Sequence, residues 1–127
     1  MCGIFGFVSK NKVDAGPIIL DGLRRLEYRG YDSAGLAAIT DRGIFTQKKS
    51  GRISALEKVI KREIGATAAI GHTRWATHGR PTDQNAHPHM SCDKKISIVH
   101  NGIVENAATL KARLQKEGHI FYSETDT

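Results

Sequence analysis

Apolar runs that favour strands alternate with helix-like segments along the chain, and this alternation limits the possible folds more than any other feature. Six runs rich in β-branched and aromatic residues are bounded by turn residues, which is typical of strands. They are residues 3–8, 34–39, 44–49, 67–71, 96–100 and 119–123. Several of their links look like hairpins, such as the turn-like 41–43. A layered α/β or α+β domain follows.

Three segments have helical spacing and recognisable ends. The first places Pro17 in the first turn, and the second opens with a capping-box pattern. Their predicted boundaries are Asp14 to Arg25, the box of Ser54 and Glu57 through to Gly65, and Asn106 to Gly118. Residues 72–94 are rich in His, Thr, Gly and Pro and are predicted to be loop.

Composition excludes several classes of protein. The chain has 127 residues, of which 39% are hydrophobic and 25% charged, so it suits one packed domain. It has no apolar run of membrane-spanning length and no signal-peptide pattern, which predicts a cytoplasmic protein without a membrane partner. The net charge is +6, but the basic residues are scattered, so nucleic-acid binding is not expected.

Cys2 is the first candidate for chemistry. Removal of Met1 would leave a thiol and a free α-amine on one residue. Free amines of this kind titrate at about pH 7.7–8.0 and thiols at about 8.5, so the amine can take the thiol proton near neutrality. The alternative is a small buried hydrophobe at the start of a strand.

Asn101-Gly102 follows the predicted strand 96–100. A side-chain amide and a backbone N–H aimed at one point can hold the charge that builds on a carbonyl oxygen during acyl transfer. The alternative is a tight turn, for which Asn-Gly is a leading signal. The two interpretations are compatible.

Two oppositely charged residues are candidates for binding a substrate. Arg74 lies in GHTRWATHG, where a guanidinium can clamp a carboxylate through two hydrogen bonds, and Asp126 can receive an ammonium group. The alternatives are a solvated Arg74 beside a core Trp75, and Asp126 as a helix cap.

The six histidines do not predict a metal site. No cysteine pair has CxxC spacing and no HExxH pattern occurs, so the histidines are assigned to loop structure and hydrogen bonding. The two cysteines, Cys2 and Cys92, do not form a disulfide framework.

One family carries all the motifs together. They are MCGIFGFV, LRRLEYRGYDSAG, GHTRWATHG, NAHPH, VHNGIVEN and SETDT, and they span residues 2–127. The chain resembles the glutaminase domain of the class II, N-terminal-nucleophile (Ntn) amidotransferases. Within this class it resembles the glutamine:fructose-6-phosphate aminotransferases more than their purine or asparagine relatives.

The resemblance implies an α+β fold, the four-layer αββα Ntn-hydrolase sandwich, of which residues 2–127 are the N-terminal part. It implies that Cys2 is nucleophile and α-amino base, and that Asn101 and the Gly102 backbone form the oxyanion hole. No metal or organic cofactor is implied.

The resemblance also implies a glutamine site. Its residues are Arg74 and Thr77 for the α-carboxylate, Trp75 and His78 nearby, Asp126 for the α-ammonium, and Arg29 beside the nucleophile. Cys92 matches no motif.

The implied activity is hydrolysis of glutamine to glutamate and ammonia. In the intact, homo-oligomeric parent the ammonia would convert fructose 6-phosphate into glucosamine 6-phosphate. The alternatives are a glutaminase serving another acceptor, such as phosphoribosyl pyrophosphate, and a catalytically idle glutamine-binding module. Because the family's glutaminase domain continues beyond SETDT and its isomerase domains lie further on, we expect the chain to be a fragment with low activity on its own.

Overall fold

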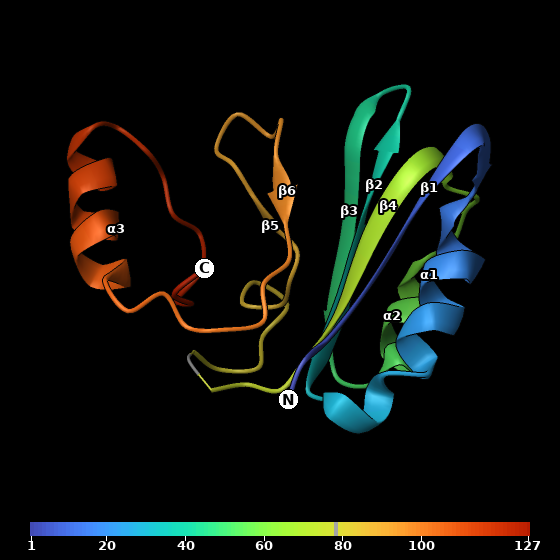
Figure 1. The fold of residues 1–127 in the computed structure, drawn as a ribbon, viewed down its shortest axis with the longest axis horizontal. Helices are drawn as coiled ribbons and strands as arrows, with labels where there is room; N and C mark the ends of the chain where they lie inside the picture. The colour runs from blue at the N-terminus through green and yellow to red at the C-terminus, as the bar shows by residue number, and fades with distance from the viewer. Residues whose placement is uncertain (78) are drawn as a thin grey trace.

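A four-stranded antiparallel sheet with the order β1-β4-β2-β3 forms the centre of the structure (Figure 1). The structure is a computed structural model that describes residues 1–77 and 79–127. The strands of this sheet are β1 (Gly3–Asp14), β2 (Ser33–Thr40), β3 (Gly43–Ser50) and β4 (Gly65–Arg74). A second, two-stranded sheet pairs β5 (His89–Met90) with β6 (Ser97–Ile98).

Two helices cover one face of the main sheet, α1 (Ala15–Arg24) and α2 (Ile53–Val59). The short 3₁₀ turn η1 (Glu27–Arg29) follows α1. The two-stranded sheet and α3 (Ala107–Lys116) lie on the opposite side of the main sheet (Figure 1). The core lies between the helices and the sheet, and its largest fully buried apolar side chains are Ile19, Leu23, Leu36 and Leu56.

The mixed α+β class and several elements are confirmed. Asp14 caps α1 by accepting a 3.2 Å hydrogen bond from the Gly16 N–H, and it accepts a second bond from the Ile64 N–H at 3.0 Å. The predicted hairpin is present as β2 and β3. α3 ends just before Gly118, whose φ of +94° suits a residue without a side chain.

Other boundaries differ from the predictions. β1 and β4 extend beyond residues 3–8 and 67–71 because they pair along most of their length. The predicted capping box at Ser54 is wrong, because the N-cap of α2 is Arg52, whose side chain makes no capping hydrogen bond. The helix ends at Val59 rather than continuing to Gly65. Asn106 occupies the N-cap position of α3, also without a side-chain capping bond.

The second half of the chain contains less regular structure than predicted. Of residues 96–100, only Ser97–Ile98 form a strand, and they pair with His89–Met90, inside the segment predicted to be loop. Residues 119–123 form no strand. Within the part of the chain that the structure describes, no strand pairs with residues 119–123, so the ladder that would hold them extended is missing.

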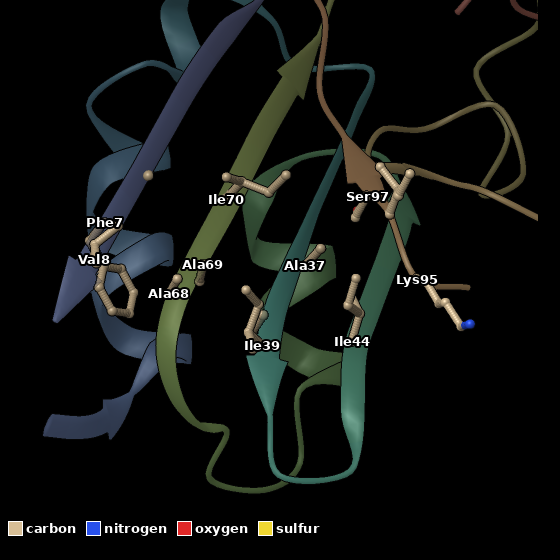
Figure 2. Close-up of a pocket in the computed structure, with 13 residues that line it drawn as sticks. Phe7, Val8, Ala37, Ile39, Ile44, Ala68, Ala69, Ile70, Lys95 and Ser97 are labelled. Atoms are coloured by element: carbon tan, nitrogen blue, oxygen red, sulfur yellow. The ribbon is translucent and has the colours of Figure 1, made fainter. Parts of the chain in front are cut away.

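The face of the main sheet opposite the helices is apolar and open. A hollow of about 620 Å³ lies on it, between the sheet and residues 95–97 (Figure 2). Val8, Ile39 and Ile44 line the hollow, and Val8 is 87% exposed. No helix among the described residues is long and apolar enough to span a bilayer.

Candidate active site

A cavity of about 380 Å³ lies where the start of β1 meets the end of β4. The antiparallel register sets Gly3 opposite Thr73, so the residues just before Gly3 and just after Arg74 lie close together. Segments from the second half of the chain complete the cavity. It gathers the predicted site residues Cys2, Arg29, Arg74, Trp75, Thr77, Asn101, Gly102 and Asp126. His78, the remaining predicted residue, lies outside the described residues.

Backbone and side-chain contacts fix Cys2 at the edge of the cavity. Its Sγ accepts a hydrogen bond from the Trp75 N–H at 3.2 Å, and the next residue, Gly3, donates its N–H to Thr73 Oγ1 at 3.2 Å. A Cβ on Gly3 would lie 2.7 Å from Leu26 Cβ. Only glycine therefore lets the chain approach Leu26 and Thr73 closely enough to hold Cys2 here.

Asn101 reaches Cys2 across 99 residues of sequence. Its Nδ2 donates to the Cys2 carbonyl at 3.1 Å, and its Oδ1 lies 2.8 Å from His72 Nε2. Gly102 has φ +156°, and a Cβ there would lie 2.7 Å from His100 Nε2. Asn101-Gly102 is not a hairpin turn, because α3 rather than a strand follows it.

Arg74 is buried, with 4% of its surface exposed, so the alternative of a solvated side chain is wrong. Its guanidinium donates to the Gly79 and Arg80 carbonyls at 3.2 and 3.1 Å and also lines the cavity. Trp75 is 44% exposed rather than part of the core. Its ring meets Tyr31 edge-on at 5.4 Å.

The segment that carries Asp126 is held by hydrogen bonds. Asp126 Oδ2 accepts from the Val104 N–H at 2.7 Å. Asn85, which is buried, donates to Glu124 Oε2 at 3.0 Å and accepts from the Glu124 N–H at 2.9 Å. This role of Asn85 was not predicted, although Asn85 opens the motif NAHPH.

The rings of three histidines contact one another beside the cavity, and those of His72 and His87 are stacked. The rings of His72 and His87 lie 4.3 Å apart, and those of His87 and His89 lie 4.4 Å apart. Burial lowers the pKa of His72, that of His87 to about 2 and that of His89 to about 4. All three are therefore neutral at pH 7. His89 Nε2 also lies 3.0 Å from Thr125 Oγ1.

His72 was not predicted as a functional residue, and the only available signal was its place in GHTRWATHG.

Among the described residues, no group of three or more His, Cys, Asp or Glu side chains is arranged to hold a metal ion.

Met1 and Arg29 lie together in the lining of the cavity. Both line it, and an Arg29 terminal nitrogen lies 3.8 Å from Met1 Sδ. Arg29 Nε is buried and has no hydrogen-bond partner within the described part of the chain. While Met1 is present, it occupies space beside Cys2 and its own amine is the chain terminus.

Cys92 lies outside this cavity. It is exposed, and its Sγ lies 3.3 Å from His119 Nδ1. The hydrogen bond with His119 lowers the pKa of the Cys92 thiol, and the same bond raises the pKa of the His119 imidazole.

Comparison with proteins of known sequence shows strong similarity along the whole chain. It is 57% identical over 129 residues to the glutamine–fructose-6-phosphate aminotransferase (isomerizing) of Thermus thermophilus. It is 51% identical over 128 residues to the enzyme of the same name from Symbiobacterium thermophilum. Each match covers all of this chain and 21% of the relative, so the chain spans about a fifth of the length of these relatives.

The fold is similar to that of a solved enzyme, the glutamine phosphoribosylpyrophosphate amidotransferase of B. subtilis, complexed with ADP and GMP. The TM-score is 0.79 at 29% identity, and the match covers all of this chain and 27% of the solved chain. A family described as the glutamine amidotransferase domain matches residues 57–127, more than half of the chain. The chain belongs to the glutamine amidotransferase domain family.

Proposed function

We propose that this chain carries the nucleophile and the substrate-binding residues of a glutamine-hydrolysing site. The observation that carries the proposal is the hydrogen bond from the Asn101 amide to Cys2, in a cavity that Gly102, Arg74 and Asp126 also line. A nucleophile, an amide donor and two opposite charges are the groups that hydrolysis of a free amino acid's side-chain amide requires.

In the proposed reaction, the Cys2 thiolate attacks the carbonyl carbon of the glutamine side-chain amide. The amide of Asn101 and the N–H of Gly102 hold the negative oxygen of the tetrahedral intermediate. The Cys2 α-amine, which has taken the thiol proton, returns it to the amide nitrogen as the C–N bond breaks, and ammonia leaves. Water attacks the resulting thioester, which releases glutamate and restores the thiol.

The base in this scheme is available only after Met1 is removed. Met1 lines the cavity, so its removal both exposes the Cys2 amine and enlarges the space beside Sγ. Arg29 then lies beside a vacated position with its buried Nε unpartnered among the described residues. We propose that Arg29 packs beside the nucleophile and contacts the processed terminus.

Recognition of the amino-acid end of glutamine is assigned to the two charged residues. Arg74 and Thr77 would bind the α-carboxylate, with Trp75 and His78 nearby, and Asp126 would bind the α-ammonium. A carboxylate accepts several hydrogen bonds, so Asp126 can keep the Val104 N–H and receive an ammonium as well. Arg74 already anchors residues 79 and 80, so it would serve the loop and the ligand together.

We further propose that residues 2–127 are the N-terminal part of a glutaminase domain with the four-layer αββα architecture. The open apolar face in Figure 2 would pack against a second sheet, of which β5 and β6 are the first strands. The shorter span of this chain relative to its relatives supports the same proposal. The isomerase domains would lie elsewhere in the complete protein.

The proposed acceptor for the ammonia is fructose 6-phosphate, with glucosamine 6-phosphate as product. The support is the 51% and 57% identity to the two aminotransferases reported above, against 29% to the phosphoribosylpyrophosphate enzyme. Phosphoribosyl pyrophosphate is therefore the second candidate. The oligomeric state of the complete protein stays a prediction.

The test is ammonia release from glutamine by the complete gene product and by its Cys2→Ser variant, after N-terminal sequencing has established whether Met1 is absent. We expect the Cys2→Ser variant to lose nearly all turnover and to retain glutamine binding, because a serine hydroxyl ionises far less readily than a thiol. Turnover close to that of the unmodified protein would refute the role of Cys2. Retained Met1 together with glutamine binding and no turnover would favour the idle binding module.

A further inference from the structure

His72 makes a direct hydrogen bond to the proposed oxyanion-hole residue. It is fully buried on β4, the strand that pairs with both β1 and β2, at Ile4 and Gly35 respectively. Its Nε2 lies 2.8 Å from Asn101 Oδ1. Asn101 itself is exposed and lies outside any helix or strand. A rigid side chain from the sheet thus holds an otherwise exposed amide.

The direction of this hydrogen bond follows from the other contact of Asn101. The Cys2 carbonyl can only accept, so the Asn101 atom 3.1 Å from it is the NH₂ group. The oxygen of Asn101 therefore faces His72, and His72 must donate from a protonated Nε2. An imidazole in this tautomer orients the amide so that its NH₂ group faces the Cys2 carbonyl.

The surroundings of His72 favour that single neutral tautomer. Its Nδ1 is buried and makes no hydrogen bond in the described part of the chain, whereas its Nε2 lies 2.8 Å from Asn101 Oδ1. The His87 ring stacks on it at 4.3 Å and fixes the plane of the imidazole. Burial lowers its pKa, Arg74 lowers it further, and the bonds to Asn101 and to the His100 backbone and the charge of Asp32 raise it by less.

We propose that His72 is a positioning residue for glutamine hydrolysis, whose Nε2–H fixes the Asn101 amide in the orientation that receives the oxyanion. The inference rests on the proposed function and assigns a role to a residue that touches neither substrate nor nucleophile. Without this hydrogen bond, rotation about the broad terminal torsion of Asn101 would misdirect its donors.

The test compares His72→Leu, which removes the donor, with His72→Gln, whose amide can place a donor near the same point. Both are made in the complete gene product and assayed for ammonia release. We expect His72→Leu to lower kcat by about ten- to a hundredfold with KM within about twofold, as for a misdirected catalytic group. We expect His72→Gln to recover most of the rate. His119→Gln, a histidine change on the surface, should leave the rate unchanged.

A double-mutant cycle separates positioning from general damage to the fold. If His72 acts only through Asn101, His72→Leu will cost nothing further in an Asn101→Ala background. Losses that multiply, or equal losses for the Leu and Gln variants, would overturn the inference. Should His72→Leu fail to fold, ¹⁵N shifts of the labelled His72 ring decide: protonated Nε2 supports the inference and protonated Nδ1 overturns it.

The outcome can be told apart from failure of the proposed function. If Cys2→Ser retains full turnover in the same assay, the glutaminase assignment itself fails. If Cys2→Ser is inactive and the His72 and Asn101 effects multiply, only the positioning role fails.

Discussion

The side-chain amide of Asn101 donates a 3.1 Å hydrogen bond to the backbone carbonyl of Cys2. This contact joins the second residue of the chain to a segment beyond β6, and both residues line the same cavity. The relationship makes Asn101 the most direct target for kinetic analysis.

Asn101→Ala is predicted to lower kcat for glutamine hydrolysis by about a hundred- to a thousandfold, the usual cost of one oxyanion donor. KM should change much less, because the donor acts mainly on charge that develops in the transition state. Steady-state ammonia release measures both constants. A raised KM with unchanged kcat would instead make Asn101 a ground-state binding or structural residue.

Asp126 and Arg74 are predicted to discriminate between the two ends of the glutamine α-carbon. Asp126→Asn should weaken glutamine binding by about tenfold or more, the scale of a hydrogen bond to a charged group, and should affect an analogue without the α-amine much less. Arg74→Ala should likewise weaken the binding of glutamine, and should affect an analogue without the α-carboxylate much less. Calorimetric titration of each variant with the three ligands measures these differences.

Arg74 needs a stability control because it is buried and anchors the carbonyls of Gly79 and Arg80. Thermal unfolding of each variant supplies it, and Asp93→Asn, a change at an exposed carboxylate, is the matched control for Asp126. Equal weakening of all three ligands would indicate damage to the fold and contradict the assignment of charges.

Cys92 is predicted to react with maleimide at lower pH than an ordinary thiol. For an ordinary thiol, the midpoint of the rise in labelling rate with pH is about 8.5. The reason is the hydrogen bond from His119, which stabilises the thiolate and lowers the pKa of Cys92. Since a lowered pKa means that thiolate appears earlier as pH rises, the midpoint should move down. His119→Asn should move it back up.

Labelling of Cys92 is followed by peptide mass mapping, which reports Cys2 separately. Lys94→Gln is the control, because it removes a nearby exposed charge without altering the bond between Cys92 and His119. A midpoint that His119→Asn does not move would show that the thiol and imidazole are uncoupled in solution.

Residues 1–127 expressed alone are predicted to self-associate and to hydrolyse glutamine poorly. Val8 and Ile39, which are 87% and 55% exposed, lie on the open face of the sheet, and contiguous apolar surface promotes association. Val8→Ser with Ile39→Ser should shift sedimentation toward the monomer. Ile18→Ser, at an exposed position on the helical face, should not. A concentration-independent monomer with full activity would make this chain a self-sufficient glutaminase.

The sequence by itself determined the local elements whose signals are short-range. The Asp14 cap, the helical repeat of Ile19 and Leu23 and the turn at 41–43 act through neighbours a few residues apart, and the structure contains the helix and the hairpin that they predict. The motifs also contain Cys2, Arg74, Asn101 and Asp126, which the structure brings together in one cavity.

Only the tertiary structure decided how far strands extend and what surrounds each candidate. β1 and β4 are longer than predicted because they pair with each other, and residues 119–123 lack a strand partner within the described chain. The burial of Arg74, the clamp of Asn85 on Glu124 and the bond of His72 to Asn101 link segments distant in sequence. Such contacts depend on the packing of the whole chain, and neither periodicity nor local spacing encodes them.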